Sequence, residues 1–209
     1  MSTTRWWWVR HAAVVNPRKL LYGRLDLPAD TGDGTAVAAL AGRLPRGAVW
    51  LQTPLRRTAE TAAALLAAMG EAASPAVEPD LIEQDFGAWQ GRPSREVYGA
   101  LPETDPFWSD PAGQAPPGGE SFDDVLRRVQ PAIRRLSAAH AGRDIVAVAH
   151  AGTVRAAMAL ALDLDGNRAL RLAVDTLSLS RIEGIASAES GSSWRVVALN
   201  LPSGTENMY

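Results

Sequence analysis

Two of the three histidines in this 209-residue chain stand directly after apolar runs that have the character of buried strands. His11 follows the run at 6–9, and His150 follows the run at 145–149. In an open α/β sheet, ligands bind beyond the carboxyl ends of the strands, so imidazoles at two such ends point to one shared site. Small residues follow both histidines, among them Ala151, and they let a ligand approach the backbone closely.

Arginines accompany these histidines. Arg10 adjoins the first, and Arg56 and Arg57 stand in the first turns of a predicted helix after the second strand. Guanidinium groups at strand ends suit bidentate binding of a phosphate, and the free N–H groups of the helix that Gly152 opens also favour an anion. Each residue alone is more typical of a structural role, as His140 at a predicted helix C-terminus illustrates. Together they predict a phosphate site.

A regular alternation of predicted strands and helices would bring these side chains to one edge of a sheet. The run at 144–149 is the clearest buried strand, and Ser121 with Asp124 three residues later predicts a helix start. The order of elements predicts an α/β fold, a three-layer sandwich with a mostly parallel central sheet. We expect strands at 5–9, 48–52, 76–78, 144–149, 177–182 and 194–199, and helices at 36–43, 54–69, 94–98, 121–140 and 152–162.

Residues 83–120 interrupt this alternation with six prolines and several glycines and tryptophans. The stretch is too long for a connection between two elements and too aromatic for a linker, so it predicts an inserted lobe or lid beside the site. Residues 202–209 are predicted to be a mobile tail. The whole chain, 1–209, is therefore expected to be a single domain with one inserted lobe.

The composition excludes several classes of protein. Hydrophobic residues make up 46% of the chain and charged residues 21%, which is typical of a globular protein. The net charge of −2 and the lack of a basic stripe argue against a nucleic-acid partner. The chain contains no cysteine, which excludes disulfides, thiolate catalysis and cysteine-bound metals. No apolar run reaches the ~18 residues of a membrane span, and the N-terminus lacks the pattern of a signal peptide, so we expect a cytoplasmic protein without a membrane partner.

Five sequence blocks resemble the histidine phosphatase superfamily, in its phosphoglycerate-mutase-like branch. Their order along the chain is that of the family, and they cover most of residues 5–160. The resemblance implies a phosphoric monoester hydrolase. The blocks are Val-Arg-His-Ala at 9–12, Thr-Pro-Leu-Arg-Arg-Thr at 53–58, Leu-Ile-Glu-Gln-Asp-Phe-Gly-Ala-Trp at 81–89, Pro-Gly-Gly-Glu-Ser at 117–121 and the strand–His–helix block at 146–155.

The resemblance also implies roles in catalysis. His11 would be the nucleophile and carry the phosphoryl group on a ring nitrogen, a task that suits a neutral imidazole. Arg10 and Arg57 would hold the phosphoryl oxygens, and His150 would add a further donor. Glu83 would protonate the leaving oxygen and then activate water against phosphohistidine. No metal or cofactor is implied, because the arginines supply the positive charge.

The loop after the first histidine departs from the family pattern. The family's glycine after that histidine is Ala12 here, and Asn16 stands one residue short of the usual position of a substrate-binding asparagine. The string Tyr22, Gly23, Arg24 is similar to the alpha-ribazole phosphatase group within the family. We therefore expect five substrate-binding residues, which are Asn16, Tyr22, Gly23, Arg24 and Ala151.

Other functions stay open at this point. A mutase of the same family would need extra basic residues in the inserted lobe, but residues 96–126 contain no Lys or Arg, which favours a phosphatase. A weakly catalytic phosphate-binding regulator is a third alternative, although the catalytic set is complete. The expected partner is a small phosphorylated metabolite, and a homodimer is one assembly that the sequence allows.

Overall fold

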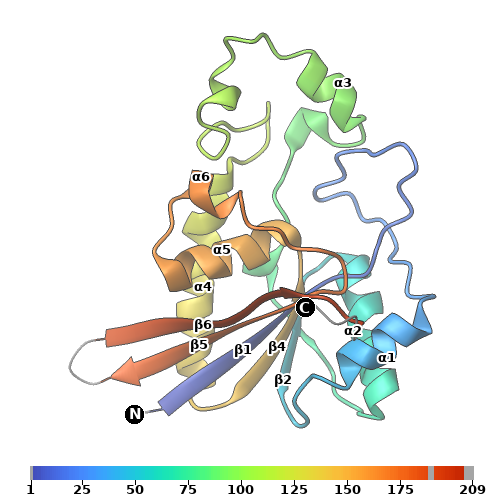
Figure 1. The fold of residues 1–209 in the computed structure, drawn as a ribbon, viewed down its shortest axis with the longest axis vertical. Coiled ribbons are helices and arrows are strands. Elements are labelled where there is room, and N and C mark those ends of the chain that lie inside the picture. The colour runs from blue at the N-terminus through green and yellow to red at the C-terminus, as the bar shows by residue number, and fades with distance from the viewer. Residues whose placement is uncertain (1, 188–190, 205–209) are drawn as a thin grey trace.

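A computed structural model describes residues 2–187 and 191–204 of the chain. Within them, a six-stranded sheet has the order β3-β2-β4-β1-β5-β6 (Figure 1). Parallel pairing joins β1 to β4, β4 to β2, and β2 to β3, whereas β5 and β6 are antiparallel. The predicted mostly parallel sheet is confirmed. The strands are β1 (Ser2–Arg10), β2 (Val49–Gln52), β3 (Ala76–Val77), β4 (Asp144–Ala149), β5 (Leu179–Ser187) and β6 (Gly191–Leu201).

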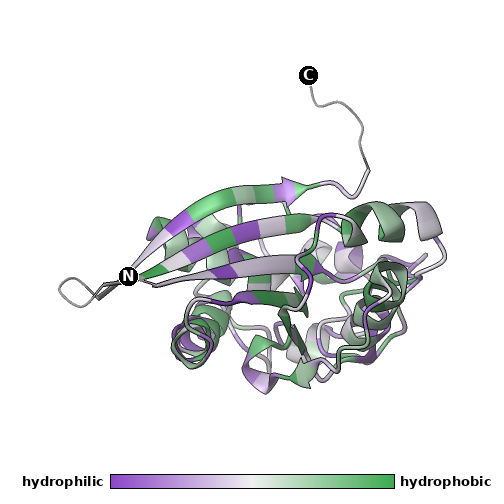
Figure 2. Ribbon diagram, turned by 90° about the horizontal axis from the view of Figure 1, so that it is seen from below, coloured by the Kyte–Doolittle hydropathy of each residue, from purple (hydrophilic) through white to green (hydrophobic). Residues whose placement is uncertain are grey.

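Helices cover both faces of this sheet, because the central strands are apolar on both faces. In β4, Ile145 and Ala147 pack among residues of α4 and α5, while Val146 and Val148 pack among residues of α1 and α2. Figure 2 shows hydrophobic and hydrophilic positions alternating along the strands nearer the sheet edge. The three-layer α/β prediction is therefore confirmed. The helices are α1 (Gly34–Ala41), α2 (Arg56–Met69), α3 (Ser94–Gly99), α4 (Phe122–Ala139), α5 (Ala151–Leu162) and α6 (Gly166–Ala169).

The pairing of β1 with β4 places the two predicted site histidines at one edge of the sheet. Arg10 is the register partner of Ala149, so both strands end at the same level. The backbone N–H of His11 donates to the carbonyl of Ala149 at 3.0 Å, which extends the pairing by one residue. His150 follows immediately as the N-cap of α5.

Several element boundaries differ from the sequence prediction. Helix α2 begins at Arg56 with Leu55 as its N-cap, so Pro54 lies before the helix rather than in its first turn. Strand β5 starts later and runs further than the predicted 177–182, because it pairs along the length of β1 and with β6. Helix α6 was not predicted. The capping box of Ser121 and Asp124 at the start of α4 is confirmed.

The stretch at 83–120, predicted to be an inserted lobe, contains helix α3 and two short 3₁₀ helices, Gly87–Trp89 and Pro106–Trp108. Most of it projects beyond one end of the sheet in Figure 1. The two ends of this stretch come into close contact at Gly87, which has φ +47°. A Cβ built on Gly87 would lie 2.3 Å from the carbonyl oxygen of Pro117. A cluster of four aromatic rings packs the lobe internally: Trp89, Tyr98, Phe107 and Trp108.

Two of the three N-terminal tryptophans lie in the core and not on a surface. Trp6 and Trp8 are buried and their rings stack with centroids 4.8 Å apart. Of the predicted mobile tail, residues 205–209 lie outside the described residues. Among the described helices, none is long and apolar enough to cross a membrane.

Candidate active site

His11 lies at the centre of the candidate site, at the carboxyl end of β1. The side chain is wholly buried, and its Nδ1 lies 2.7 Å from the carbonyl oxygen of Ala12. A carbonyl only accepts, so Nδ1 carries the proton and Nε2 keeps its lone pair. Nε2 has no partner among the described residues. Burial, together with the charges of Arg57 and Arg10, lowers the pKa of His11 to about 3, so the ring is neutral at physiological pH.

The second histidine stands beside the first. The ring centroids of His11 and His150 are 5.2 Å apart, and the planes meet at 62°. Nε2 of His150 lies 2.9 Å from the hydroxyl oxygen of Thr53, at the end of β2. When that hydroxyl donates, Nδ1 of His150 carries a proton, and Nδ1 has no partner among the described residues. Burial is the main reason that the pKa of His150 is lowered, with the neighbouring His11 adding to the shift.

Two arginines face these rings without a carboxylate partner among the described residues. Arg10 donates from Nη1 to the carbonyl of Val174 at 2.6 Å. Arg57 donates from Nη1 to the carbonyl of Leu25 at 2.8 Å and from Nη2 to that of Gly23 at 2.6 Å. In both arginines the buried Nε has no partner among the described residues. Burial lowers the pKa of the Arg57 guanidinium. Backbone carbonyls thus orient both guanidinium groups without neutralising their positive charge, and that charge can attract an anion.

Glu83 brings a carboxylate to the same site. Its Oε1 accepts a hydrogen bond from the backbone N–H of Gln84 at 3.0 Å. The carboxylate lies against the first turn of α5, where a Cβ built on Gly152 would come within 2.5 Å of Oε1. Because glycine has no Cβ, the helix start can approach the carboxylate this closely. The site therefore combines a carboxyl group with a neutral imidazole and two guanidinium groups.

An ion-pair network holds the segment that carries Glu83. Arg24 donates to the carbonyl of Glu83 at 3.1 Å and Arg128 to the same carbonyl at 3.2 Å. Both arginines also bind Glu120, at 2.9 Å and 3.0 Å, and Glu120 accepts from the backbone N–H of Asp85 at 3.0 Å. These paired charges lower the pKa of Glu120 despite its burial, which by itself raises that pKa. Arg24 thus helps to hold the backbone of the segment that carries Glu83.

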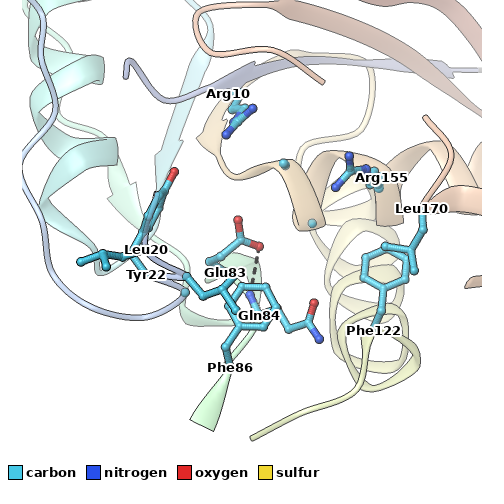
Figure 3. A pocket seen from close by; sticks show the side chains of 13 residues that line it. Arg10, Leu20, Tyr22, Glu83, Gln84, Phe86, Phe122, Arg155 and Leu170 are labelled. Carbon is cyan, nitrogen blue, oxygen red and sulfur yellow. Dashed lines mark hydrogen bonds between the residues drawn. The ribbon is translucent and has the colours of Figure 1, made fainter. Parts of the chain in front are cut away.

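A cavity of about 190 Å³ opens beside these groups (Figure 3). Its charged lining comes from Arg10, Glu83 and Arg155, and its apolar walls include Phe86 and Phe122. In Figure 3 the carboxylate of Glu83 and the guanidinium groups of both arginines point toward the same space. Polar groups of both signs that converge in a concave site are typical of a small-molecule binding site.

His11 and His150 are fully buried and are not part of the cavity lining, to which Tyr22 belongs. The Tyr22 ring lies 5.1 Å from the guanidinium carbon of Arg57 and 6.5 Å from the His11 ring, centroid to centroid. Nε2 of His11 is itself buried.

The predicted substrate-binding residues separate into two groups. Tyr22, Gly23 and Ala151 line the cavity. Asn16 and Arg24 are absent from that lining: the Asn16 side chain exchanges two hydrogen bonds of 2.9 Å with the backbone of Leu20, and Arg24 belongs to the ion-pair network. Arg56, the neighbour of Arg57 at the start of α2, pairs with Glu60 at 2.8 Å and is more than half exposed.

Sequence reasoning missed Arg155 as a cavity residue. It stands four residues after Ala151, and residues four apart on a helix share a face. That spacing could have placed it beside the site, but its distance in space from Arg10 depends on how α5 packs. Phe86, Phe122 and Leu170 also line the cavity, and they carry no chemical signal in the sequence. Within the described part of the chain, no three His, Asp or Glu side chains are grouped to hold a metal ion.

Comparison with known proteins agrees with this geometry. A family model described as the histidine phosphatase superfamily, branch 1, matches residues 6–201. This chain belongs to the histidine phosphatase superfamily. A bifunctional protein of Mycobacterium tuberculosis is 38% identical over 157 residues, which are 74% of this chain and 43% of that protein. The chain thus spans less than half the length of that relative.

Among histidine phosphatases, this chain is similar to glucosyl-3-phosphoglycerate phosphatases. One from Mycolicibacterium vanbaalenii is 37% identical over 160 residues, 71% of this chain and 69% of that protein. A solved structure of the mycobacterial enzyme has a TM-score of 0.80 at 28% identity, covering 95% of this chain and 99% of that one. The alpha-ribazole phosphatase of Shigella flexneri shares the fold, with a TM-score of 0.75 at 24% identity, covering 97% of this chain and 100% of that one.

Proposed function

We propose that this histidine phosphatase superfamily member is a phosphoric monoester hydrolase that works through a phosphohistidine on His11. One observation carries the proposal. The Ala12 carbonyl holds the proton of His11 on Nδ1, which leaves the Nε2 lone pair free beside two guanidinium groups. A nucleophile among unneutralised cations suits attack on a phosphoryl group, whose transfer depends on positioning and electrostatic stabilisation.

In the first step, the Nε2 lone pair of His11 forms a bond to phosphorus as the P–O bond to the leaving alcohol breaks. The leaving oxygen takes a proton from the carboxyl group of Glu83. Arg10 and Arg57 hold the charge on the non-bridging oxygens, and Nδ1–H of His150 is a further donor. The products are an alcohol, a phosphohistidine and the Glu83 carboxylate.

In the second step, a water molecule attacks phosphorus and the P–N bond breaks. Glu83, now ionised, accepts the proton of that water, which restores its carboxyl group. The imidazole of His11 returns to its neutral form with the proton still on Nδ1. Inorganic phosphate leaves, and every proton is accounted for without a metal ion or cofactor.

The substrate is a small phosphorylated metabolite that fits a cavity of about 190 Å³ beyond the phosphoryl site. The similar glucosyl-3-phosphoglycerate phosphatases support a phosphorylated sugar-acid derivative more than an alpha-ribazole phosphate, since the latter likeness concerns the fold. The absence of Lys and Arg from residues 96–126 favours hydrolysis over mutase transfer. The cytoplasmic location, the homodimer and the absence of a nucleic-acid partner stay predictions.

Trapping the intermediate tests the proposal. A brief reaction with a ³²P-labelled phosphomonoester in excess chelator, quenched in alkali, should leave label on the protein, and acid should remove it. His11→Ala should abolish both label and turnover. His140→Ala is the matched control, since His140 is the C-cap of α4 away from the site, and should retain both.

A different position of the label would contradict the assignment. His150→Ala should slow labelling without moving it, because His150 only stabilises the transferring group. Label that persists in His11→Ala and maps to His150 would reverse the two roles. Full activity in His11→Ala with no label would remove the phosphohistidine route.

A further inference from the structure

Asn200 lies near the end of β6, at a point where that strand departs from regular pairing. From Leu179, β5 advances two residues to its next paired position, whereas β6 needs three residues from Leu201 to reach its own. The extra residue in β6 is a β-bulge, and Asn200 lies in it with φ +54°. A residue other than glycine in this left-handed conformation points to a local constraint, and asparagine tolerates the conformation better than most residues.

The side chain of Asn200 makes two hydrogen bonds to Asp175, in the segment that precedes β5. Its Oδ1 accepts from the backbone N–H of Asp175 at 2.6 Å, and its Nδ2 donates to the Asp175 carboxylate at 2.8 Å. The backbone N–H of Asn200 donates to the hydroxyl of Ser180 at 3.0 Å. Since β6 runs in the direction of β1, this contact lies at the edge of the sheet that carries the candidate site (Figure 1).

The same segment, 174–178, holds Arg10. The carbonyl of Val174 accepts from Nη1 of Arg10 at 2.6 Å. The backbone N–H of Leu177 donates to the carbonyl of Arg10 at 3.0 Å, and the N–H of Arg10 donates to the carbonyl of Ser178 at 3.3 Å. Leu177 also has a left-handed conformation, with φ +53°. The segment therefore binds both the backbone and the side chain of Arg10.

One peptide group connects Asn200 to Arg10. The carbonyl of Val174 and the N–H of Asp175 belong to the same planar unit, so a rotation that moves one moves the other. Arg10 binds the oxygen of this unit, and Asn200 binds its N–H. The second hydrogen bond also polarises the peptide group, which makes its oxygen a stronger acceptor. Asn200 thus fixes the carbonyl that orients Arg10, although it is not among the residues that line the cavity.

We propose that Asn200 is a positioning residue for the phosphoryl site and acts on Arg10 through the peptide group between Val174 and Asp175. The inference rests on the proposed function, in which Arg10 holds phosphoryl oxygens. Among the described residues, the Arg10 side chain makes one hydrogen bond, to the Val174 carbonyl, and its buried Nε has no partner. The orientation of this guanidinium therefore depends on one carbonyl, which Asn200 holds in place.

Binding of inorganic phosphate, measured by a ³¹P NMR titration, tests the inference. Asn200→Gly removes the side chain but keeps the left-handed backbone without strain. We expect its Kd for phosphate to rise about 3- to 10-fold, as for the loss of one hydrogen bond. If Asn200→Gly does not fold, Asn200→Asp takes its place with the same expected loss, because it removes the Nδ2 donor and repels the carboxylate of Asp175.

Asn167→Ala is the matched control. The Asn167 side chain has the same arrangement, with Oδ1 accepting from the backbone N–H of Ala112 at 3.0 Å and Nδ2 donating to Asp110 at 2.7 Å. It makes no described contact with Arg10, so its loss should leave the Kd for phosphate unchanged. The thermal midpoints of both variants report what each asparagine contributes to stability. An equal rise in Kd in the two variants would contradict a specific role of Asn200.

A double-mutant cycle with Arg10 separates positioning from a general structural effect. When Arg10→Ala has removed the guanidinium, Asn200→Gly should weaken phosphate binding no further, since there is nothing left to position. Asp175→Asn keeps an oxygen that can accept from Nδ2 and should retain at least the wild-type affinity. The same loss from Asn200→Gly with and without Arg10 would show that Asn200 does not act through Arg10.

The failure of this inference differs from failure of the proposed function. An unchanged Kd for phosphate in Asn200→Gly, in a protein that still hydrolyses p-nitrophenyl phosphate, would overturn the role of Asn200 and leave the phosphatase intact. Absence of turnover with every phosphomonoester would overturn the proposed function. The phosphate titration does not depend on turnover, so it decides the role of Asn200 in either case.

Discussion

The chemical character of each site residue depends on what its other atoms bind. The proposed role of His11 as nucleophile depends on the Ala12 carbonyl, which occupies one ring nitrogen, and on burial, which keeps the ring neutral. Arg57 is available to an anion because carbonyls, which have no net charge, satisfy its terminal nitrogens. A carboxylate partner would have oriented the same guanidinium but cancelled its charge. Backbone ligation thus keeps positive charge in the site.

Substitution of Glu83 by glutamine distinguishes proton donation from binding. We expect Glu83→Gln to lower kcat for an alkyl phosphate ~10²–10⁴-fold, because an alkoxide leaves poorly without a proton. The loss should be smaller with p-nitrophenyl phosphate, whose leaving group needs little protonation. Steady-state rates with the two substrates measure the difference. Glu103→Gln in the exposed part of the lobe is the control, and equal losses on both substrates would contradict the acid role of Glu83.

At the scale of elements, the site depends on the contact between the start of α5 and the segment after the short helix at 79–81. Gly152 lies in the first turn of α5, and its missing side chain is the space that the Glu83 carboxylate occupies. Arg24 and Arg128 hold the backbone of this segment by donating hydrogen bonds to the carbonyl of Glu83. One glycine and one ion-pair network therefore determine the position of the Glu83 side chain.

Gly152→Ala should displace the Glu83 carboxylate without unfolding the protein. The clash at 2.5 Å is with the end of a flexible side chain, and alanine is a better helix former than glycine, so the thermal midpoint should be unchanged or raised. A displaced carboxylate should reduce kcat for an alkyl phosphate ~10- to 100-fold.

The matched control is Gly99→Ala at the end of α3, where an added Cβ meets nothing within 4 Å. It should retain wild-type rates. If Gly152→Ala were as active as Gly99→Ala on an alkyl phosphate, the position of Glu83 would not depend on the glycine.

At the scale of the whole molecule, burial of two neutral histidines makes stability depend on pH. The folded pKa of His11 is about 3, below the ordinary value of 6.5. Between those values the unfolded chain binds a proton that the folded protein does not, so the free energy of unfolding falls as the pH falls. One such group changes it by up to about 1.4 kcal/mol per pH unit. His150 acts in the same direction.

Urea unfolding between pH 6.5 and pH 4.5 measures this effect. Carboxylates whose pKa is lowered, such as those of Glu120 and Glu183, begin to lose their contribution as the pH approaches the ordinary value of 4.5, and they do so alike in the wild-type protein and in a His11 variant. His11→Asn should make the slope of stability against pH shallower by up to about 1.4 kcal/mol per unit. Parallel slopes in the two proteins would show that folding does not lower the pKa of His11.

The sequence alone was enough to determine the layered α/β fold and the grouping of His11 and His150. Strands and helices are local patterns of apolar residues, and the carboxyl ends of parallel strands meet at one edge. A capping box such as that of Ser121 is likewise local, since its two partners stand three residues apart. The element boundaries that depended on distant pairing, as in β5, were less accurate.

Only the tertiary structure determines which polar side chains near the site have hydrogen-bond or ion-pair partners. Asn16, Arg24 and Arg155 are all polar residues near the predicted site, but the first binds the backbone of its own loop and the second an ion-pair network. Arg155 instead lines the cavity, with its Nε donating to the carbonyl of Leu172. Such partners come from segments distant in the sequence, brought together by packing of α4, α5 and the lobe. The spacing of residues along the chain does not predict that packing.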